Sequence, residues 1–225
     1  MNKAQVLTHV FLVIFGAFFI QSKSWSEPAN LGQLKTQVKQ YHDSGEYAHD
    51  LASVASSASA YIQHYAKRNA NLTTPKKLAI VLDIDETSLS NYAFMLAHDF
   101  AATPQILKLE NSYGKATAIA PILSLYQQAL HNNVSVFFIT GRPIIYKQVT
   151  ENNLKQAGYT HWNAIYFSPS KPAKQSTLLF KENSRCDIEM HGYQVIASIG
   201  DQWSDLKGRC VEKGFKLPNV YYFIP

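Results

Sequence analysis

The chain has 225 residues, of which 46% are hydrophobic, and a formal net charge of +5. This length suits one domain with a small elaboration. The basic excess is mild and contains no dense run of Lys or Arg, so it does not indicate a nucleic-acid partner. The two cysteines form no Cys-x-x-Cys pattern and the histidines are scattered, which argues against a zinc site.

Residues 1–26 are predicted to be a signal peptide. Residues 6–20 form an apolar block whose length is typical of a signal core and short for a membrane span. Lys3 supplies a positive charge before the block, and Ser24 and Ser26 are small residues after which cleavage is expected. An uncleaved N-terminal anchor is the alternative. Because no cysteine lies near the end of the block, a lipid anchor is not indicated, and we expect a periplasmic or secreted protein without a stable membrane anchor.

Residues 27–72 are predicted to form an N-terminal helical extension. One helix is expected over residues 31–41, and the turn at Asp43-Ser44-Gly45 separates it from a longer one. Apolar side chains recur at helical spacing in the longer helix, namely Tyr47, Leu51, Val54, Ala58, Tyr61, Ile62 and Tyr65. We expect these helices to pack on the core or on a second copy of the chain, so a homo-oligomer stays open.

The apolar run at residues 78–82 predicts a buried strand near the start of a core that extends over residues 73–225. Asp83 and Asp85 follow this strand, at the edge of the sheet where α/β proteins bind ligands. Buried like charges this close repel, and a hard divalent cation such as Mg²⁺ would compensate them. A carboxylate beside Mg²⁺ can attack phosphorus. A helix N-cap or a turn is the alternative for this pair.

The remaining core alternates between strands and helices. Residues 91–118 come first and are rich in apolar and aromatic side chains, which can stack on a nucleobase or an aryl group or pack among themselves. Helices are then expected at residues 121–131, 144–157 and 203–213, and strands at residues 134–139, 163–167, 195–199 and 220–223. Such alternation implies a parallel, three-layer sheet with right-handed crossovers.

Two further strand ends carry polar residues. Thr140 and Gly141 follow the second strand, where a hydroxyl and exposed N–H groups can bind a phosphoryl oxygen, although an ordinary turn is the alternative. Asp201 and Asp205 follow the strand at residues 195–199 and offer a third carboxylate to a metal, or a helix cap. Lys181 lies between these strands and, taken alone, is typical of solvated surface.

The two cysteines are Cys186 and Cys210. In an oxidising compartment they can form a disulfide. Two separately buried thiols are the alternative. The sequence leaves both open, because it does not give the distance between the two Cα atoms.

In this order, these segments resemble the haloacid dehalogenase superfamily. More narrowly, they are similar to its acid phosphatase branch, subfamily IIIB, which includes class C and class B bacterial phosphatases and plant vegetative storage proteins. The match covers roughly residues 30–225 and is carried by Asp83–Asn91, Ile139–Arg142, Gly192-Tyr193, Ile199–Leu206 and Leu217–Pro225. It implies an α/β fold: a three-layer, Rossmann-like parallel sheet with a small cap insertion around residues 91–118 and an N-terminal helical extension.

The resemblance also implies a role for each matched residue. Asp83 corresponds to the nucleophile, and Asp85 to the general acid and base. Thr140 corresponds to the hydroxyl that binds the phosphoryl group, and Lys181 to the cation beside the nucleophile. The implied metal positions are Asp83, Asp85 (through its backbone carbonyl), Asp201 and Asp205, with Mg²⁺ as the cofactor. The positions expected to contact substrate are Asn91, Gly141, Arg142 and Arg185.

The expected function is that of an exported, Mg²⁺-dependent acid phosphatase. It would hydrolyse small phosphomonoesters, with nucleoside monophosphates among the candidates, through an aspartyl-phosphate. One alternative is a non-catalytic binding or storage protein on the same scaffold. Some plant storage relatives have lost the nucleophile, whereas this chain keeps Asp83. The other alternative is phosphotransfer to an alcohol acceptor, which uses the same intermediate.

Overall fold

The structure is a computed structural model that describes residues 28–101, 103–169 and 176–224. The predicted signal peptide, residues 1–26, lies outside the described residues. Within them, every helix is too short or too polar to cross a membrane.

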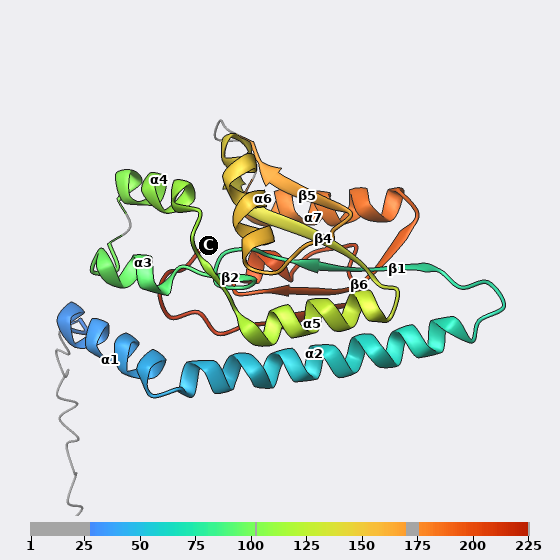
Figure 1. The fold of residues 1–225 in the computed structure, drawn as a ribbon, viewed down its shortest axis with the longest axis horizontal. Coiled ribbons are helices and arrows are strands. Elements are labelled where there is room, and N and C mark those ends of the chain that lie inside the picture. The colour runs from blue at the N-terminus through green and yellow to red at the C-terminus, as the bar shows by residue number, and fades with distance from the viewer. Residues whose placement is uncertain (1–27, 102, 170–175, 225) are drawn as a thin grey trace, which may run out of the picture.

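A five-stranded parallel sheet forms the centre of the fold (Figure 1). Across the sheet the strands are β5 (Ala164–Ser168), β4 (Ser135–Pro143), β1 (Lys77–Leu82), β6 (Tyr193–Gly200) and β7 (Lys213–Lys216). The predicted α/β architecture is therefore confirmed. The first strand in the sequence is the middle strand of the sheet, so the residues that follow it lie between the ends of β4 and β6.

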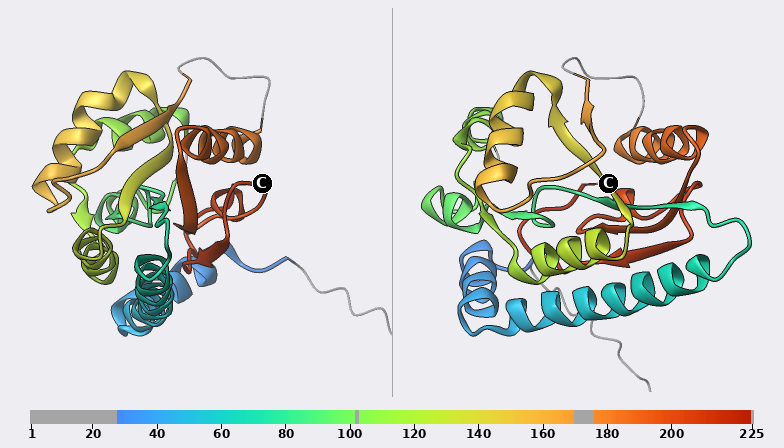
Figure 2. Two further views of the ribbon diagram at one scale, coloured as in Figure 1. Left: turned by 90° about the vertical axis from the view of Figure 1, so that its right-hand side faces the viewer. Right: turned by 45° about the vertical axis from the view of Figure 1, so that its right-hand side comes forward.

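Helices cover both faces of the sheet (Figure 2). Along β1, Leu78, Ile80 and Leu82 face one hydrophobic cluster, while Ala79 and Val81 face the other, as the two-residue period of a strand requires. The first face is covered by α2 (Glu46–Ala70), α5 (Ala120–His131) and α6 (Lys147–Gln156), and the second by α7 (Thr177–Met190). Both faces are buried, which explains why the strands are almost continuously apolar.

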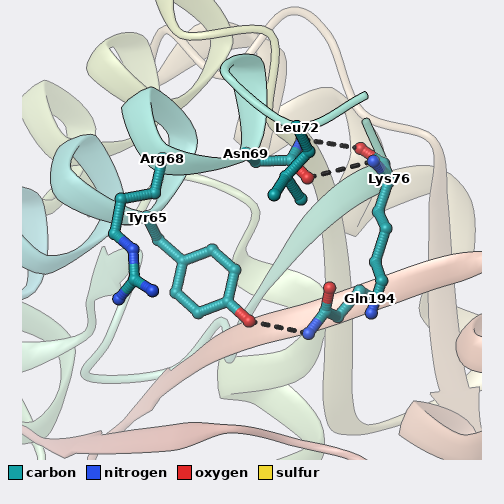
Figure 3. Close-up of a pocket in the computed structure, with 6 residues that line it drawn as sticks. All are labelled: Tyr65, Arg68, Asn69, Leu72, Lys76 and Gln194. Carbon is teal, nitrogen blue, oxygen red and sulfur yellow. Dashed lines mark hydrogen bonds between the residues drawn. The ribbon is translucent and has the colours of Figure 1, made fainter. Parts of the chain in front are cut away.

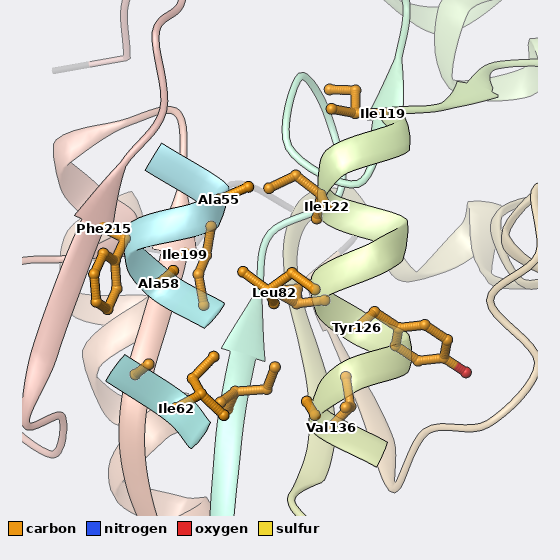
Figure 4. Close-up of a cluster of buried hydrophobic side chains, with 14 of the residues drawn as sticks. Ala55, Ala58, Ile62, Leu82, Ile119, Ile122, Tyr126, Val136, Ile199 and Phe215 are labelled. Carbon is orange, nitrogen blue, oxygen red and sulfur yellow. The ribbon is translucent and has the colours of Figure 1, made fainter. Parts of the chain in front are cut away.

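The N-terminal helices form as expected, with α1 at Leu31–Asp43 and α2 at Glu46–Ala70. Gly45 separates them with φ of 86°, a conformation that favours glycine. Figure 4 shows how α2 contributes Ala55, Ala58 and Ile62 to the larger core cluster, beside side chains of α5 and the strands. The small alanines allow α2 to approach its neighbours closely.

Two short antiparallel strands, β2 (Leu89–Ser90) and β3 (Thr117–Ala118), pair beside the main sheet. Between them the chain forms α3 (Tyr92–Ala97) and α4 (Pro104–Tyr113). Thr103 caps α4 by accepting a hydrogen bond from the N–H of Ile106. The β2–β3 pair brings together the two ends of the segment that contains α3 and α4, and this segment is the one predicted to be a cap.

The prediction of a helix over residues 203–213 is wrong. The structure has one 3-10 turn, η2 (Trp203–Asp205), then a loop, and β7 begins at Lys213. The carbonyls of Asp205, Lys207 and Arg209 accept hydrogen bonds from the Arg185 side chain. The buried guanidinium thus satisfies carbonyls that would accept backbone N–H groups in a helix. Gly208, with φ of 98°, lies within this loop.

The prediction of a last strand over residues 220–223 is also wrong. This segment is irregular, and the fifth strand is β7. The N–H groups of Tyr221 and Tyr222 donate to the side chain of Asn219, so they do not pair with a neighbouring strand. Helix α7 was not anticipated; Ser176 caps it by accepting the N–H of Leu179.

Cys186 and Cys210 form a disulfide, with Cα atoms 5.0 Å apart. It joins α7 to the loop after η2, a sequence separation of 24 residues. We expect the Cys186→Ser, Cys210→Ser double variant to lose roughly 3–4 kcal/mol of unfolding free energy, because the oxidised chain has less entropy when unfolded. Denaturant unfolding of the oxidised protein and the variant measures this difference. Equal midpoints and slopes would show that the bond contributes little.

Candidate active site

The candidate site lies at the carboxyl edge of the sheet, where three neighbouring strands end. Asp83 follows β1, Thr140 lies near the end of β4, and Asp201 follows β6. The N–H of Asp83 still donates to the carbonyl of Ile199, 3.0 Å away, so β6 holds the first carboxylate in place. Residues distant in the sequence thus meet at the edge where α/β proteins bind ligands.

Lys181 connects the carboxylates. Its Nζ lies 2.7 Å from Oδ1 of Asp83 and also donates to Oδ1 of Asp205. All three side chains are buried. Helix α7, which covers the second face of the sheet, therefore brings a cation to the carboxylates. Sequence alone placed Lys181 on the surface, and only the family resemblance brought it to the site.

Burial and mutual repulsion raise the pKa of two carboxyl groups. For Asp83, burial raises the pKa well above its usual range and Lys181 opposes the shift. For Asp201, burial and the neighbouring Asp205 raise the pKa. Burial alone would lower the pKa of Lys181, but Asp205 and Asp83 outweigh it and raise it. Three buried carboxyl groups share a single lysine, so the site favours one further cation.

The donor set fits a hard divalent cation. Asp83, Asp201 and Asp205 each offer a carboxylate oxygen, and these oxygens lie within 4.8 Å of one another. Oxygen-only ligands of this kind suit Mg²⁺ or Ca²⁺ better than softer metals. Asp205 is already engaged, because it pairs with Lys181 and its Oδ2 accepts the N–H of Gln202 at 2.8 Å. Asp83 and Asp201 are therefore the more available ligands.

Asp201 is oriented by neutral donors. The Thr87 hydroxyl donates to its Oδ1 at 3.1 Å, and the Gln202 and Asn219 amides both donate to its Oδ2 at 2.6 Å. Gly200 is required beside it, because a Cβ at that position would collide with the Asp205 side chain. Neutral donors fix the carboxylate without cancelling its charge, as expected around a metal ligand.

Asp85 points to a different partner. The Arg142 Nη2 lies 2.7 Å from its Oδ1 and the Arg142 Nε lies 3.0 Å from its Oδ2, while Asn91 Nδ2 donates to Oδ1 at 2.7 Å. Burial alone would raise the pKa of Asp85, but the charge and hydrogen bonds of Arg142 and Asn91 lower it. Arg142 itself is buried and also donates to the Thr150 hydroxyl. Arg142 and Asn91 thus contact the predicted acid and base directly.

Thr140 and Gly141 are placed differently. Thr140 is fully buried, and its hydroxyl oxygen accepts the N–H of Arg142 at 3.1 Å, which leaves the hydroxyl proton free to donate. Gly141 lines the cavity described below, together with Arg142. The end of β4 therefore places one buried hydroxyl and one cavity-lining backbone segment at the same sheet edge as Asp83, and Thr140 itself is not among the residues that line the cavity.

Arg185 lies away from the substrate-facing surface. Its guanidinium is buried and donates to backbone carbonyls of residues 205–209. It does not line the cavity. We therefore expect Arg185 to hold the loop that carries Asp205 and not to contact substrate.

Several site residues were not found from the sequence. Glu86 is buried with φ of 51°, accepts the N–H of Asn91 at 2.6 Å, and has a pKa raised by burial and by Asp85. The Tyr222 hydroxyl donates to Glu86 at 3.2 Å. Gln202 and Asn219 hold Asp201, as described above. Gln202 and Asn219 both lie in segments that carry the family resemblance, but the sequence reasoning gave neither of them a role.

A cavity of about 390 Å³ opens over these groups. Its polar end contains Asp83, Asp85, Lys181 and Asp201. Its apolar wall combines cap residues with residues of the C-terminal segment, namely Met95, Phe100, Leu107, Tyr221, Phe223 and Ile224. The cap also contributes Glu110, whose pKa burial and the nearby Asp85 raise to about 7. The cavity can therefore hold a small anion attached to an apolar group.

A second hollow of about 180 Å³ lies at the far end of α2 (Figure 3). Its polar side chains mostly bond to each other or to the backbone: Tyr65 accepts from Gln194 at 2.7 Å, and Asn69 bonds the backbone of Lys76. None of the carboxylates of the candidate site lines it. The chemistry is therefore concentrated at the carboxyl edge of the sheet.

Comparison with known proteins agrees with this geometry. The family model described as HAD superfamily, subfamily IIIB (acid phosphatase), matches residues 21–225. The chain is 30% identical over 193 residues to Acid phosphatase 1 of Solanum lycopersicum, across 83% of this chain and 73% of the relative. It is 28% identical over 203 residues to Vegetative storage protein 2 of Arabidopsis thaliana, across 88% and 73%. The class C acid phosphatase from Bacillus anthracis has the same fold, with a TM-score of 0.66 at 20% identity and 86% coverage of both chains.

Proposed function

Because the chain belongs to the acid phosphatases of HAD subfamily IIIB, which are phosphomonoesterases, we propose that it hydrolyses small phosphomonoesters at Asp83 with the help of Mg²⁺. The observation that carries this proposal is the position of Asp83. Asp83 lies at the polar end of the cavity, where its carboxylate pairs with Lys181 and lies near that of Asp201. Asp85 lines the same cavity. Nucleoside monophosphates are candidate substrates, since the opposite wall is apolar.

In the proposed reaction, the Asp83 carboxylate attacks phosphorus and the bond to the leaving oxygen breaks. Asp85 donates a proton to that oxygen, and an acyl phosphate remains on Asp83. Asp85 then removes a proton from water, which attacks the phosphorus, releases phosphate and restores Asp83. Thr140 and the Gly141 backbone would bind the phosphoryl oxygens, and Lys181 would limit charge repulsion. Transfer to an alcohol follows the same steps with the alcohol in place of water.

Asp85 must be protonated for the first step, whereas its pair with Arg142 lowers its pKa. We expect the phosphoryl group to compete for Arg142 when substrate binds, because a guanidinium forms similar paired hydrogen bonds with phosphate and with carboxylate. Loss of the pair raises the pKa of Asp85 towards that of a buried acid. Arg142 therefore acts in this proposal on both the substrate and the acid.

Asp83, Asp201 and the backbone carbonyl of Asp85 would hold the cation. When bound, Mg²⁺ would supply positive charge to the phosphoryl oxygens. Asp205 would act on the site indirectly, by holding the ammonium group of Lys181, with which it forms an ion pair.

Mg²⁺ dependence is the direct test of this assignment. We expect EDTA to abolish phosphate release and added Mg²⁺ to restore it. The Asp201→Asn variant should need roughly tenfold or more Mg²⁺ for half-maximal activity, because it loses one anionic ligand. Phosphate release is measured against Mg²⁺ concentration for both proteins. An unchanged titration in Asp201→Asn would remove this residue from the metal site.

The storage alternative has some support from the relative named a vegetative storage protein. A panel of a nucleoside monophosphate, an aryl phosphate and a glycerol phosphate, from pH 5 to 8 with Mg²⁺, separates the two functions. Release of phosphate from any of them supports the enzyme. Complete inactivity across the panel favours storage or binding despite the intact carboxylates.

We also propose that the protein is exported to the periplasm or secreted. The predicted signal peptide supports this location, and so does the Cys186–Cys210 disulfide, since such bonds persist mainly in oxidising compartments.

A further inference from the structure

The C-terminal segment, defined here as residues 219–224, is irregular and yet firmly held by the site. The Asn219 amide nitrogen donates to Asp201 at 2.6 Å, and its oxygen accepts the N–H of Tyr221 at 2.7 Å. One side chain thus orients a site carboxylate and turns the backbone of the segment.

Two further anchors lie beyond this turn. The Gln202 side chain accepts the N–H of Ile224 at 3.0 Å while it donates to Asp201. The Tyr222 hydroxyl donates to the buried Glu86. The segment is therefore fixed to residues that follow both β1 and β6.

The aromatic side chains of the segment face different surroundings. Tyr221 packs against Tyr47 of α2, Tyr92 of α3 and Phe100, with ring centroids 5.6, 5.7 and 6.1 Å away. Phe223 lines the cavity but is 75% exposed. Tyr221 thus has a structural role, whereas Phe223 presents an open aromatic surface at the apolar wall.

Because Phe223 lines the cavity that contains Asp83 and keeps an open ring face, an apolar group of a bound ligand can pack against it. Phe100, Met95 and Leu107 of the cap line the same cavity. A flat apolar group attached to a phosphate bound near Asp83 would enter between the cap and the C-terminal segment, where aromatic stacking is favourable.

We propose that Phe223 is a specificity-determining residue that contacts the leaving group and favours aromatic phosphomonoesters over small aliphatic ones. This inference rests on the proposed function for the position of the phosphate. It assigns the selection of substrate to the C-terminal segment as well as to the cap.

Two phosphonates that are not hydrolysed provide the test. Phenylphosphonate carries the aromatic group and methylphosphonate does not. Calorimetric titration of the full-length mature protein with Mg²⁺ gives the ratio of the two affinities. We expect Phe223→Ala to lower this ratio about tenfold, and Phe223→Tyr to restore most of it. Met190→Ala is the matched control, because Met190 is 78% exposed on α7 and lies outside the cavity; its ratio should equal that of the wild type.

Turnover of phenyl phosphate and glycerol phosphate by the same proteins distinguishes the two proposals. If phosphate is released but the affinity ratio is the same in Phe223→Ala and wild type, the role of Phe223 is refuted and the phosphatase stands. If no ester is hydrolysed but the ratio falls, the phosphatase is refuted and Phe223 still selects aromatic ligands. If Phe223→Ala weakens the binding of phenylphosphonate and methylphosphonate by the same factor, Phe223 has a general structural role and its proposed role in specificity is refuted.

Discussion

Asp83→Asn should lower phosphate release by on the order of a thousandfold or more, because the variant lacks the nucleophile. An amide cannot displace the leaving oxygen, and the remaining donors only position the substrate. The change should leave the fold intact, since Lys181 keeps Asp205 as a partner and the amide fits the same space. Initial rates at saturating Mg²⁺ measure the loss, with circular dichroism as the check on folding.

Asp99→Asn is the matched control, because Asp99 lies in the cap with an exposed carboxylate that pairs with Lys35. Its rate should equal that of the wild type. Substantial turnover by Asp83→Asn that survives repurification would show that another group attacks phosphorus.

Lys181→Met should impair both stability and turnover. The substitution keeps an unbranched side chain but leaves Asp83 and Asp205 buried without their cation. Breaking a buried ion pair in this way costs about 3–5 kcal/mol. The loss should be largest at neutral pH and fade as pH falls. Burial holds the folded-state pKa of Asp83 above its unfolded value even in the presence of Lys181, so protonation of Asp83 at lower pH relieves the repulsion.

Denaturant unfolding at pH 5 and pH 8 measures this effect. The double variant Lys181→Met, Asp205→Asn serves as the matched partner, because it removes one of the two unpaired charges and should regain part of the lost stability without regaining activity. Destabilisation that does not change with pH would mean that packing, and not charge, explains the role of Lys181.

The sequence predicts the part of the site that depends on strand ends. Asp83, Thr140 and Asp201 each follow an apolar run, and parallel strands bring their carboxyl ends to one edge. No long-range contact has to be known for this inference. Four of the five predicted strands also form, and β7 is the fifth strand in place of residues 220–223.

Residues that act through backbone contacts escaped prediction. The loop at residues 206–212 is held by Arg185 and a disulfide, whereas its place between two predicted strands suggested a helix. Asn219 likewise replaces strand pairing with hydrogen bonds from its side chain. In each case a tertiary partner satisfies backbone groups that local patterns assign to regular structure.

The order of strands across the sheet also has a consequence during synthesis. β1 is made early, yet both of its neighbours come later, and β6 follows it by more than a hundred residues in the chain. Pairings this distant in sequence form slowly. A nascent chain that ends before β6 lacks Asp201, Asp205 and the segment that closes the cavity. Hydrolysis should therefore begin only when translation is complete and the last strands have docked, so no growing intermediate consumes phosphoesters where the chain is made.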